Sequence, residues 1–422
     1  MKNIFVEGIQ GSGKSTLVNN ISKLSPKSHV CREGDYSPVD LAWCAWMSEQ
    51  EYMTILEKHS SLRDEIIKNT VKEQENYIVT YTKVITDISG FYKELETYEV
   101  YNGRKPWQEL KNIILTRFQN FPETGYLFEC AFFQNIIEDL ILFHMLNDEE
   151  IMDFYRELFE IVAGRDFVLL YLYSDTLEEN IRVIQKERCD GDGNELWYQM
   201  MLEYLICSPY GKKNGCSTFE DLVAHFEHRQ RLELSIIKEI LGEKAVVLRS
   251  KEYDMKQIVS SLGYHIRYIT DTEYERLDDF LYEAIFIPEG VDAPPREIIN
   301  DPQLQVYVQN FGTQEGDICF VAEVEESIIG AVWVRIMDDY GHVEDGVPSF
   351  AISLYKEYRG FGIGTAMMKQ MLEELEVRGY EKASLAVQKA NYAVKMYKNV
   401  GFEIVDENEE EYIMICELNL LR

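Results

Sequence analysis

The first part of the chain alternates short apolar runs with longer stretches of helical periodicity. The apolar runs are four to seven residues long, the length of buried strands. Residues 39–120, between the second and third runs, read mostly as helix and form an insertion. Strands that alternate with helices predict an α/β fold with a doubly wound parallel sheet. The expected strands are residues 3–6, 28–33, 125–130, 167–173 and 245–249.

The pattern restarts near residue 263. A short strand and a helix come first, and after a proline-rich passage two strands joined by a tight polar turn read as an antiparallel hairpin. We therefore expect two domains, residues 1–263 and 264–422, the second an α+β domain with a mixed, mainly antiparallel sheet. Its expected strands are residues 265–269, 318–324, 328–336, 349–355 and 383–387, and its helices are residues 272–286 and 366–379.

Net charge, apolar runs and cysteine spacing argue against several classes of protein. The 422 residues carry a net charge of −32, which repels nucleic acid and anionic membranes and either favours basic substrates or serves solubility alone. No run of 18 apolar residues is present, and the eight cysteines include no C-x-x-C pair, which argues against a membrane span, a zinc site and a disulfide framework. The chain enters a strand at once, without a signal peptide. These features predict a cytoplasmic protein that acts on small molecules, and a homodimer is compatible with them.

The first expected strand leads into a glycine-rich motif. Residues 8–16 fit G-x-x-x-x-G-K-[ST], with a strand before and a helix after, which is the context that this motif requires. The glycines let backbone N–H groups turn toward phosphate oxygens at a helix N-terminus. Lys14 would neutralise the β- and γ-phosphates, and Ser15 would offer its hydroxyl to Mg²⁺. The motif predicts binding of ATP or GTP through Gly8, Gly11, Ser12, Gly13, Lys14, Ser15 and Thr16.

Charged residues follow the later strands of the first domain. Glu33 ends the second strand and Glu129 ends the third, at the edge of an α/β sheet where ligands bind. After the fourth strand, Arg182 and Arg188 lie on an expected helix that precedes a flexible turn at residues 189–194. Basic residues on a hinged segment can close over a triphosphate and stabilise the charge of its transferring phosphoryl group, so both arginines are catalytic candidates.

Two features of this domain leave alternatives open. The tyrosine-rich insertion either shapes an acceptor pocket or consists of plain structural helices. His225 and His228 lie three apart on an expected helix with two arginines, and they either contact phosphate or belong to a solvated face.

The first domain resembles the deoxynucleoside and nucleoside monophosphate kinases. The resemblance rests on the P-loop, on the arginine-rich helix, and on Glu33, Tyr36, Pro38 and Trp43. It implies that Glu33 is the general base on the acceptor hydroxyl and that Glu129 joins Ser15 at Mg²⁺. The family's Glu-Arg-Ser is Glu129-Cys130-Ala131 here, without the arginine. A kinase for another small hydroxyl compound, or a nucleotide switch without acceptor chemistry, therefore fits as well as a nucleoside kinase.

The second domain contains another candidate anion site. Gly360, Gly362 and Gly364 precede the long helix, where freed backbone N–H groups can hold a pyrophosphate. Such a glycine pattern also occurs in dinucleotide sites. A dinucleotide site needs a parallel βαβ unit at the start of its domain, whereas this loop follows an antiparallel meander.

Farther along, the sequence resembles the GNAT acetyltransferases. The resemblance rests on Arg359-x-x-Gly362-x-Gly364 and on Asn391, Ala393, Tyr397 and Gly401-Phe402. It implies acetyl-CoA as cofactor, with the pantetheine arm paired to the backbone of Ile352, Ser353 and Leu354, whose N–H would polarise the thioester carbonyl. Asn391 would also contact the cofactor, and Tyr397 would protonate the departing thiolate. The CoA pyrophosphate would lie on Arg359, Gly360, Phe361, Gly362, Ile363, Gly364 and Thr365.

These patterns together predict a bifunctional enzyme that modifies small molecules. The second domain would acetylate a primary amine, with Glu344 or Asp345 as the base, and the acidic segment 337–347 would select a cationic amine. The first domain would transfer phosphate from ATP to a hydroxyl. Two alternatives stay open: the first domain regulates the acetyltransferase as a nucleotide-binding module, or the second domain acetylates a protein.

Overall fold

The computed structural model describes residues 2–25, 27–120, 124–188, 196–253, 255–288, 290–324, 327–337 and 343–418, apart from the side chains of residues 187, 256 and 260–262. The chain divides into two compact units, Met1–Tyr253 and Asp254–Arg422. The division precedes helix α12 (Met255–Leu262), whereas the sequence analysis placed the boundary after this segment.

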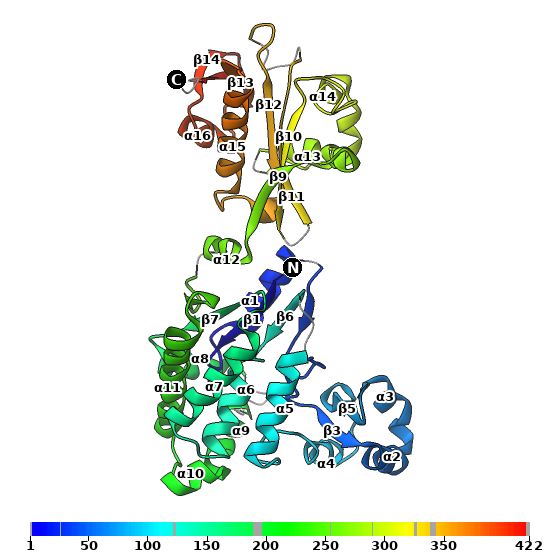
Figure 1. The fold of residues 1–422 in the computed structure, drawn as a ribbon, viewed down its shortest axis with the longest axis vertical. Coiled ribbons are helices and arrows are strands. Elements are labelled where there is room, and N and C mark those ends of the chain that lie inside the picture. The colour runs from blue at the N-terminus through cyan, green and yellow to red at the C-terminus, as the bar shows by residue number, and fades with distance from the viewer. Residues whose placement is uncertain are drawn as a thin grey trace. The chain divides into compact units, whose positions relative to one another are not determined.

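A five-stranded parallel sheet forms the centre of the first unit (Figure 1). Its order is β2-β6-β1-β7-β8, and each pair of neighbours is parallel. All six residues of β1 are buried, as in a strand covered on both faces. The five strands are those expected from the apolar runs: β1 (Asn3–Gly8), β2 (His29–Cys31), β6 (Tyr126–Glu129), β7 (Phe167–Tyr173) and β8 (Ala245–Arg249).

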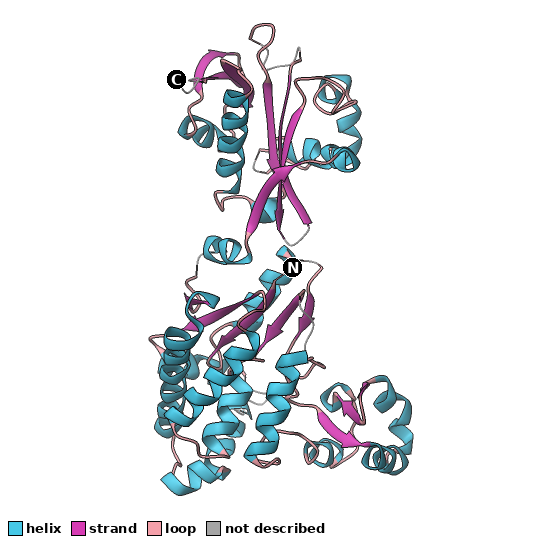
Figure 2. Cartoon of the chain, viewed as in Figure 1, coloured by secondary structure: helices cyan, strands magenta, loops and turns pink. Residues whose placement is uncertain are grey.

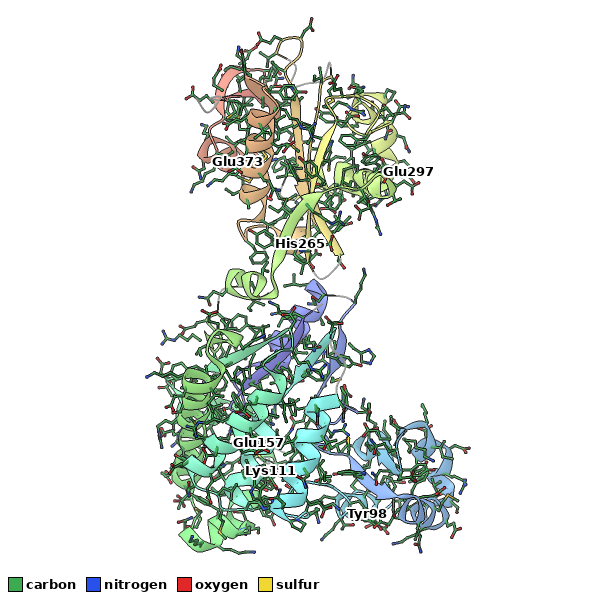
Figure 3. The ribbon with its side chains drawn as sticks, viewed as in Figure 1. Tyr98, Lys111, Glu157, His265, Glu297 and Glu373 are labelled. Carbon is green, nitrogen blue, oxygen red and sulfur yellow. The ribbon has the colours of Figure 1, made fainter. Side chains whose placement is uncertain are left out.

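Helices of the first unit pack around this sheet. Helix α1 contacts β1 and β6, and the main core joins Phe5, Phe128 and Tyr171 to apolar residues of α5, α6, α7 and α11. Lys111 of α5 and Glu157 of α7 form an ion pair on the outer side of this layer (Figure 3). The helices are α1 (Lys14–Leu24), α5 (Trp107–Asn120), α6 (Gln134–Leu142), α7 (Asp148–Val162), α8 (Leu177–Glu187), α9 (Leu196–Cys207), α10 (Pro209–Asn214) and α11 (Phe219–Ile236).

The insertion differs from the helical segment that we expected. It contains a three-stranded antiparallel sheet of order β3-β5-β4, visible as short magenta strands in Figure 2, with its own apolar core. Each strand has only four residues, too few to show a period of two beside the longer helical stretches. The elements are β3 (Ala45–Ser48), α2 (Glu49–Lys58), α3 (Arg63–Lys68), β4 (Thr70–Glu73), β5 (Asn76–Val79) and α4 (Phe91–Glu96).

A seven-stranded mixed sheet forms the centre of the second unit, in the order β14-β15-β13-β12-β11-β10-β9. Only the β12–β13 pair is parallel among the described pairs, so the mixed, mainly antiparallel sheet is confirmed. The strands are β9 (Tyr264–Tyr268), β10 (Ile318–Val324), β11 (Ser327–Arg335), β12 (Ser349–Leu354), β13 (Lys382–Gln388), β14 (Glu403–Glu407) and β15 (Glu411–Glu417). Strands β14 and β15 were not expected from the sequence. Three of the five residues of β14 are acidic, and β15 is a short apolar segment between two glutamates.

Two helices cover the strands that lead to the glycine loop. Helix α13 (Leu277–Ala284) packs on β11 and β12, and α15 (Ile363–Val377) contacts β10, β11 and β12. Figure 1 shows the two helices flanking these strands. The expected helix 272–286 is shorter, because a 3₁₀ turn (Asp271–Arg276) precedes α13. The remaining helices are α14 (Pro302–Gln305) and α16 (Ala393–Asn399). No helix in the described parts of the chain has the length and hydropathy to cross a membrane.

Candidate functional sites

The glycine-rich loop of residues 8–16, the candidate P-loop, connects β1 to α1, in the strand–loop–helix order that its motif requires. Gly11 and Gly13 have φ angles of +78° and +94°, which residues with a Cβ rarely adopt. Gly13 is the N-cap of α1, and no described side chain caps this helix end. The first N–H groups of α1 are therefore available to an anion.

The ammonium of Lys14 lies over this loop. Its Nζ donates hydrogen bonds to the carbonyl oxygens of Gly8 (2.8 Å) and Ile9 (3.1 Å), and the residue is only 7% exposed. A cation close to an uncapped helix N-terminus favours negative charge, so the loop suits phosphate oxygens.

Close packing explains why two positions of the loop, Gly8 and Gly11, require a residue without a Cβ. A Cβ added to Gly8 would lie 2.6 Å from the carbonyl oxygen of Leu172, and one added to Gly11 would lie 1.5 Å from Cδ1 of Ile184. Ile184 belongs to α8, so this helix packs directly on the P-loop. Around Gly13 no described atom lies within 4 Å of an added Cβ, which leaves the face over the helix N-terminus open.

The structure brings Ser15 and Glu129 together. The Ser15 hydroxyl donates a hydrogen bond to Oε1 of Glu129, and Arg32 Nη1 lies 3.8 Å from the other carboxylate oxygen. A hydroxyl and a carboxylate are oxygen ligands of the kind that Mg²⁺ prefers, so this pair fits the ion. Within the described ranges, no three His, Cys, Asp or Glu side chains come together as a protein-only metal site requires. Sequence reasoning missed Arg32, although its place beside Glu33 at the end of β2 was a usable signal.

Glu33 lies at a cavity of the first unit, and two neighbours orient its carboxylate. Oε1 accepts hydrogen bonds from Trp43 Nε1 (3.1 Å) and Gln134 Nε2 (3.2 Å). Trp43 has a φ of +60°, an unusual conformation for a bulky residue and one often found at functional sites. The cavity has a volume of about 510 Å³, and Gln10 of the P-loop also lines it. An acceptor group in this cavity would therefore lie between Glu33 and the phosphate loop.

The lining of this cavity comes from distant segments of the chain. Glu96, Glu99, Tyr101 and Asn102 belong to the insertion and its end, so the insertion contributes to this cavity. Its role in binding an acceptor stays a prediction. Glu203 comes from α9, and further lining residues come from α6, α9 and α11. Burial raises the pKa of Glu99 to about 7.

A buried polar network supports one wall of the cavity. His225 is 4% exposed, and its Nε2 lies 2.6 Å from Oε2 of Glu138, which also pairs with Arg229. Burial alone would raise the pKa of Glu138, but the charges of His225 and Arg229 lower it to about 2. The solvated-face interpretation is therefore wrong for His225, while His228 is partly exposed and pairs with Asp148.

The predicted lid arginines have other partners in this structure. Arg182 donates to Glu178 (2.8 Å) and lies over the ring of Phe219, while Arg188 lies over the ring of Trp197. Neither guanidinium hydrogen-bonds to the P-loop among the described residues. The expected flexible turn at residues 189–194 lies outside the described residues.

The glycine loop of the second unit opens onto the N-terminus of α15. Gly360 and Gly362 have φ angles of +84° and +82°, and Gly362 is an N-cap without a capping bond from any described side chain. A Cβ on either glycine would meet no described atom within 4 Å. A Cβ on Gly364 would lie 3.3 Å from Leu354 of β12 and from Met396 of α16, so three elements meet here. This open cradle of N–H groups, which continues through Phe361, Ile363 and Thr365, fits a pyrophosphate.

The side chain of Arg359 stabilises the loop through hydrogen bonds to other parts of the second unit. Its Nε donates to the carbonyl oxygen of Leu354 (2.8 Å), and Nη2 donates to the carbonyl oxygen of Glu283 (3.0 Å) and to its carboxylate. The side chain thus ties the end of β12 to α13. In this geometry Arg359 positions the loop, with its guanidinium bound to groups of the protein.

Strands β12 and β13 diverge next to this loop. Their pairing is confined to Ser349 opposite Ser384, whereas β12 stays paired with β11 through Ile352, Ser353 and Leu354. The Ser353 hydroxyl donates to the carbonyl oxygen of Phe280 and so fixes the strand on α13. The edge of β12 that faces β13 is therefore available for pairing with an extended ligand.

Tyr397 and Asn391 lie on and before α16. Tyr397 is 9% exposed, and burial raises the pKa of its phenol well above the ordinary value, so the hydroxyl keeps its proton at neutral pH. Asn391 Oδ1 accepts a hydrogen bond from the backbone N–H of Ala393 (2.9 Å) and stabilises the start of this helix. Glu344, one of the two expected bases, accepts a hydrogen bond from Lys382 (3.0 Å). Residues 338–342 of the acidic segment lie outside the described residues.

Known proteins match this second unit. The model of the acetyltransferase (GNAT) family matches residues 282–402. An acetyltransferase of Pectobacterium atrosepticum is 31% identical over 109 residues, which cover 25% of this chain and 71% of that protein. The probable N-acetyltransferase san of Drosophila melanogaster is 32% identical over 101 residues, which cover 24% of this chain and about half (54%) of that protein.

A solved structure also matches at low identity. The PaiA N-acetyltransferase of Thermoplasma acidophilum, in complex with coenzyme A, is 16% identical, with 37% of this chain and 99% of that chain covered and a TM-score of 0.30. Through its second unit, the chain belongs to the GNAT family of acetyltransferases.

Proposed function

We propose that the second unit transfers an acetyl group from acetyl-CoA to a primary amine. The observation that carries the proposal is the open N-terminus of α15 beside the divergence of β12 and β13, in a chain of the GNAT family. Acetyl-CoA supplies the activated acetyl thioester. The N–H groups from Gly360 to Thr365 would hold its pyrophosphate, and the free edge of β12 would pair with the pantetheine arm.

The protein's own groups would then assist the transfer. A backbone N–H of β12 would donate to the thioester carbonyl and stabilise the oxyanion, and Asn391 would contact the cofactor after its helix-capping bond rearranges. Tyr397 would give its proton to the departing thiolate, which needs a phenol that is still protonated at neutral pH. Glu344 or Asp345 would accept the proton of the amine.

A matched pair of glycine substitutions tests this proposal. Gly362→Glu puts a carboxylate into the anion cradle, and we expect it to weaken acetyl-CoA binding by at least about 100-fold through charge repulsion and lost backbone contacts. Gly379 lies at the other end of α15 and also has a positive φ with open space around it, so Gly379→Glu is the control. Isothermal titration measures the acetyl-CoA affinity of both variants and of the unmodified protein. An equal loss of affinity in the two variants, or no binding by the unmodified protein, contradicts the proposal.

For the first unit we propose nucleoside triphosphate binding and phosphoryl transfer to a small hydroxyl compound. The position of Lys14 over the loop and the Ser15–Glu129 pair favour it. The α1 N-terminus and Lys14 would hold the phosphates of ATP or GTP, Ser15 and Glu129 would hold Mg²⁺, which offsets phosphate charge, and Glu33 would accept the proton of the acceptor hydroxyl.

Two substitutions separate a kinase from a nucleotide-binding regulatory module. We expect Lys14→Ala to weaken ATP binding by about tenfold or more, because one charge that faces the phosphates is lost. Glu33→Gln keeps the hydrogen-bonding shape, so it should keep ATP binding and lose turnover. If no acceptor gives a phosphorylated product while ATP still binds, the regulatory alternative holds.

A further inference from the structure

The cavity beside Glu33 has a chemical character that the P-loop does not explain. Five glutamates line it, namely Glu33, Glu96, Glu99, Glu138 and Glu203, and no lysine or arginine lies among its described lining residues. Arg104 pairs with Glu96, and Arg229 pairs with Glu138. Among the described residues, no lysine or arginine forms an ion pair with the other three.

Six side chains of the lining direct hydrogen-bond donors to partners within the protein. Trp43 and Gln134 donate to Glu33, Asn102 donates to Glu99 (2.7 Å), and Asn135 donates to Asp40 (2.9 Å). The two tyrosine hydroxyls behave likewise, since Tyr101 donates to Asp40 and Tyr204 donates to Asn102. What remains for a ligand is mainly a set of acceptors, together with the side-chain amide of Gln10.

Two buried atoms on the wall lack a partner and point to a ligand. Gln134 is 5% exposed, and its Oε1 accepts no hydrogen bond from any described residue. Oε1 of Gln10, another residue of the lining, is buried and likewise accepts no hydrogen bond from any described residue. An unsatisfied buried acceptor costs free energy, so a bound N–H or O–H group would relieve it.

We propose that this cavity binds a hydroxylated amine in its cationic form and presents one of its hydroxyls between Glu33 and the P-loop. The proposal rests on the proposed phosphoryl transfer and names its acceptor class. Ammonium groups would meet Glu99 and Glu203, and a hydroxyl or ammonium would donate to Gln134 Oε1. An acceptor that carries a phosphate, such as a nucleoside monophosphate, does not fit, because no lysine or arginine of the described lining would meet that phosphate.

Binding measured without nucleotide tests the proposal. Isothermal titration of the full chain would use kanamycin A, D-glucosamine and spermidine, which differ in size and hydroxyl content, and the fully N-acetylated derivative of kanamycin A as the neutral control. We expect one or more of the hydroxylated amines to bind more tightly than spermidine, and the affinity to fall as NaCl rises to about 0.3 M. N-acetylation of kanamycin A should weaken its binding at least about tenfold, since it removes the positive charges.

Charge-matched variants locate the bound amine. Glu99→Gln and Glu203→Gln should each weaken binding by about threefold to tenfold, because each removes one carboxylate from the wall. Glu203 is exposed, so its variant keeps the fold even if substitution of the buried Glu99 disturbs it. Glu160 is exposed on α7 outside the cavity, and Glu160→Gln, with the same change of net charge, should leave affinity unchanged.

The binding experiment distinguishes a failure of the cavity assignment from a failure of the proposed phosphoryl transfer. If no hydroxylated amine binds at millimolar concentration, if the N-acetylated derivative binds equally well, or if Glu203→Gln behaves like Glu160→Gln, the cavity assignment is overturned. If an amine binds as expected but ATP and Mg²⁺ give no phosphorylated product, the assignment of the cavity stands and the proposed phosphoryl transfer fails.

Discussion

At the scale of single residues, Tyr397 is the clearest case of a side chain whose environment suits one chemical role. Burial keeps its phenol protonated, as a general acid requires. We expect Tyr397→Phe to lower kcat of acetyl transfer by about 100-fold while the affinity for acetyl-CoA stays within about twofold. Tyr392 is 68% exposed at the start of the same helix, so Tyr392→Phe is the matched control. Equal kinetics for both variants would remove Tyr397 from the chemistry.

Glu7, the residue before the P-loop, predicts a pH dependence of stability. It is fully buried and accepts hydrogen bonds from the N–H groups of Phe132 (2.6 Å) and Gln134 (3.3 Å). Burial raises its pKa from 4.5 to about 8. Between these values the folded state binds more protons than the unfolded state, so the free energy of unfolding falls as the pH rises through this window.

Urea unfolding at about pH 5 and about pH 8.5 measures this effect. The loss of stability between the two pH values should be smaller in Glu7→Gln than in the unmodified protein, because glutamine does not titrate. Glu160→Gln, at an exposed position, should reproduce the unmodified behaviour. Parallel curves for all three proteins would show that Glu7 titrates normally.

At the scale of elements, one buried ion pair joins the strands of the second unit to the segment before them. Arg335 at the end of β11 donates to both carboxylate oxygens of Asp317 (2.7 and 2.9 Å) and to the carbonyl oxygens of Val306 and Gln309. Burial opposes ionisation of Asp317, but its hydrogen bonds from Arg335 and from backbone N–H groups hold its pKa below the ordinary value. This pair fixes the chain that enters β10.

We expect Asp317→Asn to destabilise the second unit by about 3 kcal/mol, because it leaves the buried charge of Arg335 without a counterion. Glu374→Gln removes an exposed pair with Arg378 on α15 and should cost less than about 0.5 kcal/mol. Thermal unfolding followed by circular dichroism compares the two. A small effect of Asp317→Asn would mean that water or another group compensates Arg335.

Some strands of this protein could be predicted from the sequence, and others could not. Strand β7 is a continuous apolar run, and β1 and β10 are built around the buried apolar runs 4–6 and 318–322, so their own composition reveals them. The four-residue strands of the insertion exist because they pair with one another and close a small core, which no local window contains. Long-range pairing overrides local periodicity there.

At the scale of the whole molecule, the two proposed cofactor sites lie in different compact units. We expect Lys14→Ala to weaken nucleotide binding without changing acetyl-CoA affinity, and Gly362→Glu to do the reverse, because each substitution acts within one unit. Native mass spectrometry with ATP, Mg²⁺ and acetyl-CoA offered together measures both occupancies. A change of acetyl-CoA affinity in Lys14→Ala would instead support a regulatory role of the first unit.

The amino-acid sequence by itself determined the two glycine loops and the strands that precede them. A positive φ, a free helix N-terminus and a buried apolar run are local properties, so residues 8–16 and 359–365 could be identified with their chemistry. The partners of the charged side chains could not be identified in this way, because many of them are distant in the sequence. Arg359 turns toward Leu354 and Glu283, and His225 turns into the core toward Glu138.

Only the tertiary structure decided the character of the cavity beside Glu33. Its glutamates come from the end of β2, the insertion, α6 and α9, and each alone resembles any acidic residue on a protein of charge −32. Folding brings them to one wall and directs the neighbouring donors to partners within the protein. Which hydrogen-bonding groups remain for a ligand depends on contacts between distant segments, and a linear pattern does not contain those contacts.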